Sequence, residues 1–588
     1  MTTTSLPART RLDRRTLIKA AGGTLGLAAL GGAAACTPAE GSDPGTGPSV
    51  DPNVHLELPE PIERPYPDPY AGPRAYDRKP FGDPSTSFRV VVPQDSLVGD
   101  WNVNEFSRWL EQRTGVKIEY QAVNMKGPDG SEDLSKINAM LSSGDLPDAF
   151  LGINLSPSQI SLYGEQELFL ELGPLINAYA PVERQLMSEV ETIKQTMTAR
   201  DGKIYQYASI SDCYHCRTTT SKTFINTDYL AKIGAAMPET TDDFRNVLRE
   251  LKARNPSGKK GFLPFLGGNA GWDGMDVWFV NPYTFNPGKP WIRLNNGRME
   301  FVANTDGWRQ GMALMRSLYD DGTLTKQSFS IATPEMAKLG DQGLIGCARS
   351  YYWGGFLSIS YDDDALWRRY QPVLPLVGPG GNRLTSTNHY LSPWRTLLIT
   401  KNCRRPDLLV QWADYQMDLE PILRAYDTGG EPGAQWDYAK KGEKGIDGRQ
   451  AVWKAITEYG TDTTPGRGWS QYSLMYRSLD FRNAQYADPK APTFESELYR
   501  VSQQYEKFSQ PVDSQLPPLI FGEASIAEIS DLETTIGDHV IKSMAKFATA
   551  GLDVHDDAVW NDYMATLEKM NLGQYLELFQ RAYDERPR

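Results

Sequence analysis

Several tryptophan and tyrosine residues of this 588-residue chain stand in loops rich in glycine, asparagine and aspartate, and not on apolar stripes. A sugar ring has an apolar C–H face and a rim of hydroxyl groups, so an aromatic ring beside Asp, Asn, Gln or Arg side chains suits it. The loops of this kind predict six ligand-stacking rings: Trp272, Trp278, Tyr352, Trp353, Trp394 and Trp436. Ordinary packing is the alternative for each ring, and Trp291, Trp308 and Trp367 are expected in the hydrophobic core.

Three polar residues are predicted to surround the same ligand. Asp95 and Asn154 closely follow two β-prone runs, 88–92 and 149–152. Ligands of parallel α/β sheets bind beyond the carboxyl ends of the strands, which is where these two side chains are expected. Glu431 stands in the loop that leads to Trp436, so it is expected in the polar rim of the site.

No catalytic motif accompanies these residues. The histidines outside the first 35 residues do not occur at HExxH spacing, and GxSxG, P-loop and GxGxxG patterns are absent. A glycosidase needs two carboxyl groups ~5 to 10 Å apart, and a sequence alone cannot place such a pair. We therefore predict a binding protein and not an enzyme, and a surface polysaccharide-degrading enzyme stays open as an alternative.

The cysteines are few. Cys213 and Cys216 are separated by two residues, one of them His215, and no second pair stands at zinc spacing. A local disulfide or two reduced thiols is therefore favoured over metal or redox chemistry. The four cysteines beyond Cys36 allow three pairings if all are bonded, but Cys347 and Cys403 are most simply core thiols. No metal site is predicted.

The first 35 residues are typical of an export signal. Arg14 and Arg15 precede a run of small, weakly apolar residues that is too short for a membrane span, and together they resemble a twin-arginine signal. The run ends at 33–36, which resembles a lipobox and predicts lipidation of Cys36, with ordinary cleavage after Ala35 as the alternative. Twelve of the forty prolines follow before residue 85, so 36–85 is expected to form a semi-stiff tether. For the part after Pro59, which includes Tyr66 and Tyr70, a coat packed on the folded body is the alternative.

Beyond the tether, β-prone runs alternate with amphipathic segments, as in α/β proteins. Strands are expected at 88–92, 115–120 and 149–152, and helices at 101–113 and 134–141. Near the end of the chain, Ser525 and Glu528 have capping-box spacing, which predicts a helix from there to Gly551. Two further helices are expected at 557–570 and 572–582.

The stretch 202–256 is predicted to form strands and then two helices, the second with a capping box between Thr240 and Asp243. Short motifs here and elsewhere resemble the extracellular solute-binding lipoproteins of carbohydrate ABC transporters, of the family 1 type. Within that family, the similarity is to the large subgroup that includes alginate-oligosaccharide-binding proteins. The motifs are 143–148, 169–176, 201–205, 226–230, 232–234, 237–238, 398–403, 430–433, 560–563 and 580–584.

The resemblance implies a two-lobed periplasmic-binding-protein-like α/β fold. Each lobe is expected to be a mostly parallel sheet flanked by helices, with hinge crossings between the lobes. The expected lobe 1 comprises 86–207 and about 396–430, and the expected lobe 2 comprises 208–395 and about 431–588.

The implied function is that of the substrate-binding receptor of an ABC importer, which binds an oligosaccharide between its lobes and delivers it to a membrane permease. We expect a monomer, anchored through Cys36 at the outer face of the cytoplasmic membrane. The net charge of −13 argues against nucleic acid as a partner. A peptide-binding ABC receptor is the alternative within the same class of protein.

The resembled proteins often carry an acidic calcium loop after the helix that begins near Thr240. Calcium takes six to eight oxygen ligands, several of them charged. Residues 255–261 of this chain contain two lysines and no carboxylate, so we predict no calcium there and no other cofactor.

Overall fold

The computed structural model describes residues 54–126, 132–218, 222–268, 274–390, 393–426, 429–458, 461, 464–488, 490 and 492–586. All of them belong to one of the two units into which the chain divides, Gly47–Arg588. The export signal, Cys36 and Trp272 lie outside the described residues. Within the described part, no helix combines the length and the apolar character that crossing a membrane requires.

A six-stranded sheet forms the first of two cores. Its strand order is β16-β6-β13-β5-β3-β4, in which β3 pairs in parallel with β4 and β5, and β6 pairs in parallel with β16. Strand β13 runs antiparallel to both of its neighbours. The strands are β3 (Ser87–Pro93), β4 (Lys117–Val123), β5 (Ala149–Ile153), β6 (Tyr207–Ser211), β13 (Trp394–Ile399) and β16 (Tyr476–Arg477).

Both faces of this sheet are covered. Val90 and Val92 pack into one hydrophobic cluster, whereas Val91 between them packs into another, as the alternation of a strand requires. Helix α1 begins after Asn104, whose side chain accepts hydrogen bonds from backbone N–H groups of the first turn. The helices are α1 (Glu105–Thr114), α2 (Ser135–Ser143), α3 (Pro157–Glu165), α4 (Gly173–Tyr179), α5 (Pro181–Glu189), α6 (Glu191–Met197), α12 (Pro406–Tyr415), α13 (Leu419–Ala425) and α14 (Leu479–Asn483).

A four-stranded sheet forms the second core, with the order β12-β7-β11-β8. Only β11 and β8 are parallel, and β7 runs antiparallel to β11 and to β12. This sheet is more mixed than the sequence pattern predicted; its one parallel pair is joined through helices, as a parallel pair requires. The strands are β7 (Thr223–Asn226), β8 (Leu263–Leu266), β11 (Ile345–Arg349) and β12 (Tyr370–Val373).

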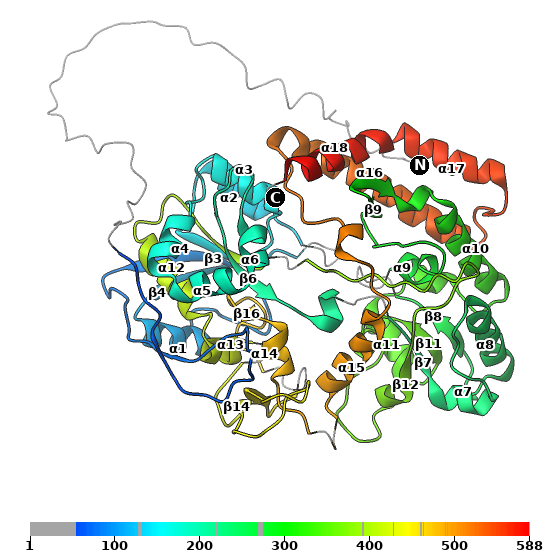
Figure 1. Cartoon of the computed structure of the whole chain (residues 1–588), viewed down its shortest axis with the longest axis horizontal. Coiled ribbons are helices and arrows are strands. Elements are labelled where there is room, and N and C mark those ends of the chain that lie inside the picture. The colour runs from blue at the N-terminus through cyan, green and yellow to red at the C-terminus, as the bar shows by residue number, and fades with distance from the viewer. Residues whose placement is uncertain are drawn as a thin grey trace, which may run out of the picture. The chain divides into compact units, whose positions relative to one another are not determined.

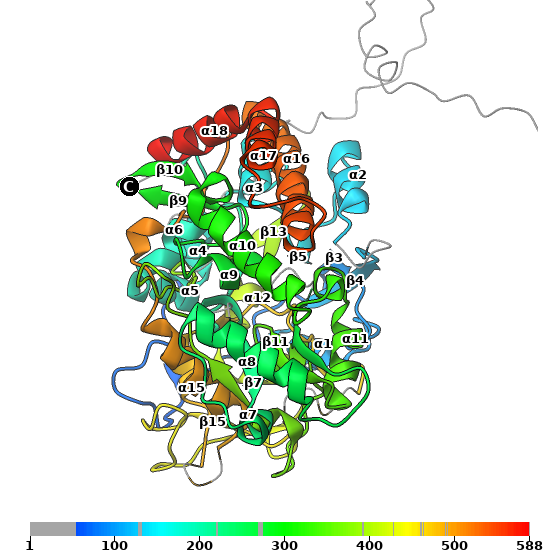
Figure 2. The same ribbon diagram turned by 90° about the vertical axis from the view of Figure 1, so that its right-hand side faces the viewer.

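The helices around the second sheet follow the predicted apolar stripes. The predicted capping box between Thr240 and Asp243 is confirmed at the start of α8, which buries Phe244 and Leu248. Helices α16, α17 and α18 lie together beside α10 (Figures 1 and 2). The helices and the hairpin strands are α7 (Thr227–Ile233), α8 (Thr241–Arg254), α9 (Met275–Val280), β9 (Ile292–Asn295), β10 (Arg298–Phe301), α10 (Asp306–Asp320), α11 (Thr333–Asp341), α15 (Phe494–Glu506), α16 (Glu523–Ala548), α17 (Asp557–Lys569) and α18 (Leu572–Glu585).

One predicted cap is wrong. Helix α16 begins at Glu523 with Gly522 as its N-cap, so Ser525 lies inside the first turn and does not cap the helix. Glycine is an acceptable N-cap residue, and the helix starts there without a side-chain hydrogen bond.

The segment after the loop at Glu431 returns to the first sheet, although the sequence assigned 431–588 to the second lobe. Its hairpin of β14 (Trp436–Tyr438) and β15 (Trp453–Ala455) packs against α13, and β16 then adds an edge strand beside β6. Trp469 is buried among Trp101, Phe106 and Trp412. These large buried rings hold the segment on the first core.

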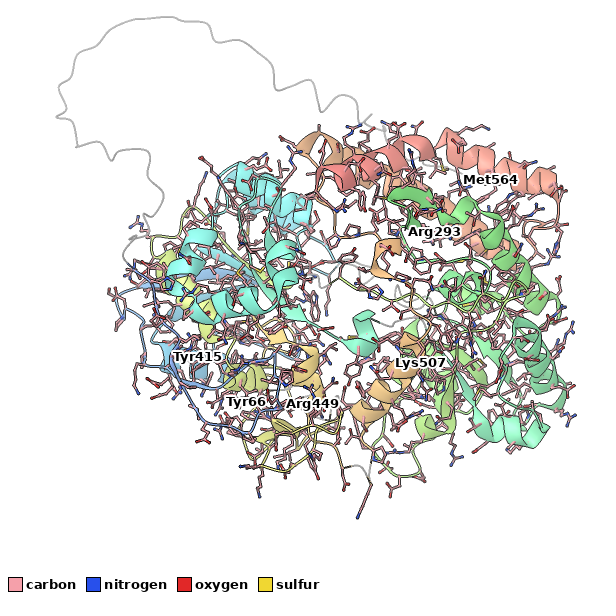
Figure 3. All side chains as sticks on the ribbon, in the orientation of Figure 1. Tyr66, Arg293, Tyr415, Arg449, Lys507 and Met564 are labelled. Atoms are coloured by element: carbon pink, nitrogen blue, oxygen red, sulfur yellow. A yellow bond between two sulfur atoms is a disulfide. The ribbon has the colours of Figure 1, made fainter. Side chains whose placement is uncertain are left out.

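Part of the proline-rich tether also packs on this core. Tyr70 is buried in the same cluster as Trp436, and Arg449 donates a hydrogen bond to the carbonyl of Pro69. Figure 3 shows Tyr66 and Arg449 in this region. The C-terminal half of the predicted tether is therefore a coat on the folded body.

Candidate ligand-binding pocket

A cavity of about 320 Å³ is lined by residues that follow strands of both sheets. Ser211 and Arg477 contribute from the ends of β6 and β16, and Trp394 from the start of β13. Tyr352, just after β11, and Glu495, in the first turn of α15, contribute from the second core. We call this cavity the main pocket.

A smaller cavity of about 70 Å³ adjoins the main pocket. Trp436 and Trp453 of the β14–β15 hairpin line it, together with Gln435 and Glu458. The two cavities share five lining residues: Tyr426, Arg477, Arg482, Phe494 and Glu495. Aromatic rings line both cavities, and we call the smaller one the side pocket.

Three of the predicted stacking rings reach this space. Tyr352 and Trp394 are half-buried and line the main pocket, one from each core. Trp436 lines the side pocket, and its indole N–H donates to the carbonyl of Gly430. The structure therefore brings together three rings that lie far apart in the sequence.

Two other predicted rings do not face it. Trp353 is 1% exposed, packs on Phe224, and donates its indole N–H to the carbonyl of Tyr370. Trp278 is buried against Phe244. Neither ring lines the main pocket or the side pocket, so both are assigned to packing in the core. Trp291, Trp308 and Trp367 are buried as predicted.

Asp95 and Asn154 lie beyond the carboxyl ends of β3 and β5, and neither lines the two pockets. Asp95 accepts hydrogen bonds from the N–H of Leu97 and from the Tyr472 hydroxyl, at 2.8 and 3.4 Å. Asn154 accepts one from the backbone N–H of Arg395, at 3.4 Å. These two residues therefore support the wall next to Trp394.

Arg395 is the residue that connects this wall to the pocket, and the sequence interpretation missed it. Its guanidinium carbon lies 4.2 Å from the centre of the Tyr472 ring and 5.3 Å from that of Trp394. Its backbone has a φ of +60°, at the point where the pairing of β13 with β6 is irregular. Such a left-handed conformation is uncommon for a residue other than glycine and is often found near functional sites.

Glu431 is exposed at the edge of this region. Its carboxylate lies 2.7 Å from an Arg424 nitrogen, and it lines neither pocket. Gln435, four residues later, takes the position in the side pocket that the sequence pattern assigned to Glu431.

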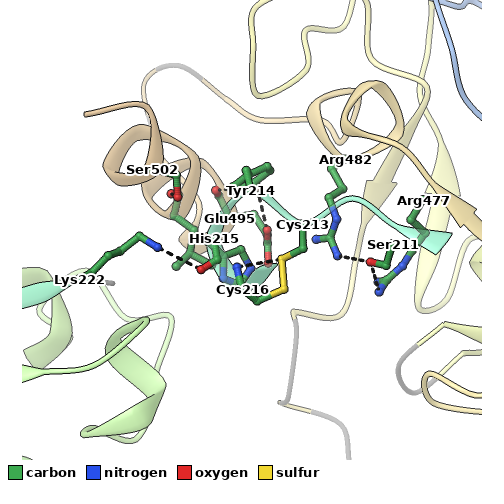
Figure 4. Close-up of a disulfide and its surroundings, with 11 residues drawn as sticks. Ser211, Cys213, Tyr214, His215, Cys216, Lys222, Arg477, Arg482, Glu495 and Ser502 are labelled. Carbon is green, nitrogen blue, oxygen red and sulfur yellow. Dashed lines mark hydrogen bonds between the residues drawn. A yellow bond between two sulfur atoms is a disulfide. The ribbon is translucent and has the colours of Figure 1, made fainter. Parts of the chain in front are cut away.

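The connection from β6 to β7 forms the floor of the main pocket around a disulfide between Cys213 and Cys216 (Figure 4). The turn is a π-helix, Tyr214–Thr218, a rare element that is frequent at functional sites. Burial lowers the pKa of His215, and Arg482 and Lys222 lower it further, so this imidazole is neutral.

Cys213, His215 and Cys216 also form the one group of metal-ligand types found together among the described residues, with ligand atoms within 4.8 Å of one another. Cysteine binds a metal ion as a thiolate. Both sulfur atoms are joined in the disulfide here, so neither is available as a thiolate ligand. Cys347 and Cys403 are free and buried, as predicted.

The polar groups of the pocket are of both charges. The Tyr214 hydroxyl donates to the Glu495 carboxylate at 3.0 Å. Burial raises the pKa of Glu458, and the neighbouring Glu495 raises it further. Arg477 and Arg482 also line the pocket, and both donate to the Ser211 hydroxyl.

A third cavity, of about 550 Å³, lies beyond the carboxyl ends of β8 and β11. Arg349, the last residue of β11, lines it together with Asp276 and Trp291. Gly268 and Gly274 also line it, and these residues flank the predicted ligand loop that contains Trp272. It shares no lining residue with the main pocket, so the two cavities are separate.

The family described as bacterial extracellular solute-binding protein matches residues 87–415. The fructooligosaccharide ABC transporter substrate-binding protein FusA of Streptococcus pneumoniae is 24% identical over 487 residues, which are 81% of this chain and 86% of FusA. Lipoprotein LipO of Bacillus subtilis is 27% identical over 271 residues, 45% of this chain and 49% of LipO.

Solved structures share the fold. FusA in complex with kestose superposes with a TM-score of 0.70 at 22% identity, over 85% of this chain and 99% of that one. The alginate-binding protein AlgQ2 superposes with a TM-score of 0.60 at 19% identity, over 85% of this chain and 98% of that one. The two-lobed α/β fold that the sequence motifs implied is thereby confirmed.

Proposed function

Because this chain belongs to the bacterial extracellular solute-binding protein family, we propose that it is the substrate-binding receptor of an ABC importer and that its ligand is an oligosaccharide. The observation that carries the proposal is the main pocket, which Trp394 and Tyr352 enter from two different cores. An aromatic ring on each side and hydrogen-bonding groups between them suit a sugar ring with two apolar faces and a polar rim.

The side pocket extends this site. Trp436 and Trp453 supply further aromatic surface, and Gln435, Glu458 and Glu495 supply hydrogen-bond acceptors. One monosaccharide does not need two adjoining cavities, so we propose a ligand of two or more sugar units. FusA, a relative over most of this chain, is named for fructooligosaccharides, which supports the same class of ligand.

Ligand binding acts through the connections between the cores. Residues of the β6–β7 connection line the main pocket, and so does Trp394, at the end of the segment that leads back to β13. A ligand that contacts both cores favours the conformation in which both contacts are made, which is the logic of hinge closure. We propose that this conformation is the one that the permease recognises.

For the location, we propose export by a twin-arginine signal and attachment to the membrane through a lipid on Cys36. The relative LipO is named a lipoprotein, which supports this assignment. Replacement of Cys36 by Ser should release the protein from the membrane fraction into the medium or periplasm. Recovery of the Cys36→Ser protein in the membrane fraction would contradict the proposal.

The proposed function is tested by a thermal-shift screen of the exported chain, carrying Cys36→Ser, against oligosaccharides and peptides. A ligand that binds only the folded state at ~100 times its Kd adds roughly 2.7 kcal/mol to the free energy of unfolding. We expect a stable shift with an oligosaccharide. A shift with peptides alone would identify a peptide receptor instead.

The same samples test for catalysis. Glu458 and Glu495 both line the side pocket, and the enzyme alternative requires such a carboxylate pair. We propose that the bound sugar is not cleaved, so chromatography should recover it intact after prolonged incubation. Appearance of shorter products, lost on Glu495→Gln, would make the protein a glycosidase.

A further inference from the structure

The turn between β6 and β7 brings three side chains of metal-ligand type together at the floor of the main pocket. The ligand atoms of Cys213, His215 and Cys216 all lie within 4.8 Å of one another (Figure 4). Two ligands of one bound ion are roughly 3.5–4 Å apart, given metal–sulfur bonds of ~2.3 Å and metal–nitrogen bonds of ~2.0 Å. Small side-chain rotations would therefore bring all three onto a single ion, once the two sulfur atoms are no longer bonded to each other.

His215 gives an independent indication of a ligand. Its Nδ1 atom is buried and has no hydrogen-bond partner in the described part of the chain. A buried polar atom left unpaired costs about 1–3 kcal/mol, so such an atom calls for a further partner. The ring itself is held by its neighbours, with ring centres 5.6 Å from Tyr214 and 6.2 Å from Tyr352. Imidazole is the commonest metal ligand in proteins, and this one is fixed beside two cysteines.

The surroundings of the two sulfur atoms suit thiolates. The backbone N–H of Cys216 donates to Cys213 Sγ at 3.1 Å, and a donor in this position stabilises negative charge on the sulfur. The Lys222 ammonium donates to the His215 carbonyl at 3.0 Å, so a cation also stands beside the turn. Metal-binding cysteines are found in such electropositive surroundings.

The main pocket gives access to this turn. His215 and Cys216 both line the cavity, so ions and thiol reagents reach them without unfolding of the protein. Cys347 and Cys403 are 0% and 2% exposed and line none of the described pockets. A reagent in the pocket therefore distinguishes the two kinds of cysteine.

We propose that reduction of the Cys213–Cys216 disulfide turns the floor of the main pocket into a copper(I) site, with the two sulfur atoms and the His215 imidazole as ligands. The electrons come from a dithiol. Its two sulfur atoms join in a new disulfide, the Cys213–Cys216 bond breaks, and two protons pass to the cysteine sulfurs. Copper(I) then replaces these two protons, which are released to the solvent.

The ligand set favours copper(I) over zinc. Thiolates are soft ligands and select copper(I) and zinc among the biological metals. A structural zinc ion takes four protein ligands, whereas the group among the described residues has three members, a number that copper(I) accepts. Lys222 beside the turn also repels a divalent ion twice as strongly as a monovalent ion at the same distance.

The first experiment asks whether the disulfide is reduced in the folded protein. The exported chain, carrying Cys36→Ser, is treated without oxygen with a water-soluble phosphine, which takes oxygen from water as it reduces the disulfide, and the phosphine is removed by gel filtration. We expect two thiols to react with a colorimetric reagent in the native protein and four after unfolding in urea, since Cys347 and Cys403 are free but buried. If no thiol reacts in the native protein, the proposal is overturned.

The second experiment measures copper(I) binding to the reduced chain. Copper(I) is supplied as its coloured bicinchoninate complex, and transfer to the protein is followed as loss of colour. We expect one equivalent to pass to the reduced chain and none to the disulfide form. Cys213→Ser and Cys216→Ser should each abolish the transfer, and His215→Gln should weaken it at least tenfold. Cys403→Ala is the matched control, because it removes a thiol outside the pocket, and it should bind copper(I) as before.

The melting temperature provides a readout that does not depend on colour. Copper(I) bound only by the folded state should raise the melting temperature of the reduced chain by several degrees and leave that of the disulfide form unchanged. Far-ultraviolet circular dichroism checks that each variant is folded. Should a cysteine variant fail to fold, His215→Gln still decides the question, because it keeps the disulfide and both sulfur atoms and removes only the nitrogen ligand.

Three outcomes would overturn the inference. The reduced chain could take up no more copper(I) than the disulfide form, or uptake could persist in Cys213→Ser and Cys216→Ser, which would place the ion elsewhere. In a parallel titration, binding of Zn²⁺ in preference to copper(I) would overturn the choice of metal. The sugar screen uses the disulfide form, so failure of the copper(I) site would leave the oligosaccharide receptor intact, and failure of the receptor would leave the copper(I) site intact.

Discussion

Two buried arginine sites in this protein differ in how their charges are compensated. Arg78, beneath the first sheet, donates to both oxygens of Asp418 at 2.8 Å and to Asp414 at 2.9 Å. Burial by itself would lower its pKa, but the two carboxylates outweigh burial and raise it. Among the residues that the structure describes, Arg482 in the wall of the pocket has one hydrogen bond, which it donates to a hydroxyl.

The Arg78 site is complete without any ligand. The other oxygen of Asp414 accepts hydrogen bonds from the N–H groups of Val182 and Glu183 and from the Tyr207 hydroxyl. This network joins Arg78, in the C-terminal part of the predicted tether, to the core. In the pocket wall, Arg482 donates to the Ser211 hydroxyl, an acceptor that it shares with Arg477. Arg78 is thus held by two carboxylates, whereas the acceptor of the Arg482 hydrogen bond is a neutral hydroxyl.

The strongest test of this contrast is Asp414→Ala. The substitution leaves Arg78 with one carboxylate and leaves two backbone N–H groups without an acceptor. Removal of one partner of a buried ion pair costs about 3–5 kcal/mol, so we expect a loss of that size in the free energy of unfolding, measured by urea denaturation. A loss below 1 kcal/mol would show that the network does not stabilise the fold.

The second test uses pH. The Glu183 side chain is 2% exposed, and burial together with Asp414 raises its pKa to about 8. The folded state therefore keeps this proton up to about pH 8, whereas the unfolded chain releases it near pH 4.5. The contribution of Glu183 to the free energy of unfolding is therefore fully present below pH 4.5 and is lost as the pH rises from 4.5 to about 8.

Glu183→Gln keeps the shape and removes the titration. We expect the variant to match the wild type within about 1 kcal/mol at pH 5 and to exceed it by ~2–4 kcal/mol at pH 8, since each pKa unit corresponds to about 1.4 kcal/mol. Denaturation curves at both pH values measure the difference. An equal offset at the two pH values would mean that Glu183 does not titrate in this window.

The third test moves to the pocket. Trp394→Ala should weaken oligosaccharide binding tenfold or more, about 1.4 kcal/mol, because a stacking face is lost. Because the Trp394 ring is half-buried, Trp394→Ala should lower the free energy of unfolding less than Asp414→Ala does. Tyr583→Ala is the control, since that ring is half-buried on α18 and lines none of the described pockets. Calorimetry measures both affinities, and unchanged binding by Trp394→Ala would remove this residue from the site.

The smallest effect is expected at an exposed ion pair. Arg89 and Asp145 lie 3.1 Å apart, with side chains 43% and 76% exposed. Exposed pairs contribute little, so Asp145→Ala should change the free energy of unfolding by less than about 1 kcal/mol. If Asp145→Ala lowered the free energy of unfolding as much as Asp414→Ala does, burial would not explain the difference between the Arg89–Asp145 and Arg78–Asp414 ion pairs.

The local patterns of the sequence predicted local structure well. The capping box at Thr240 and the apolar stripe through Phe244 and Leu248 specify α8 by contacts within one helix. The strands before Asp95 and Asn154 were predicted in the right order because β-branched runs alternate with amphipathic segments. The motifs shared with solute-binding proteins implied the two-lobed fold.

The pocket could not be predicted in the same way. Tyr352 and Trp353 are neighbours in the sequence, yet one lines the main pocket and the other is buried against Phe224. Both stand where a short 3₁₀-helix begins, and nothing in the residue types says which ring will turn inward. For a single aromatic residue in a loop, tertiary packing decides whether the ring is buried in the core or lines a pocket.

The arginine pair shows the same limit over a longer distance. Arg477 lies in a two-residue strand, too short for a periodic signal, and Arg482 follows in a five-residue helix. Their shared acceptor, Ser211, is more than 260 positions earlier in the chain. The sequence by itself determined the helices, most strands and the family. Only the tertiary structure decided which charges are compensated, because compensation depends on groups from distant segments that meet after folding.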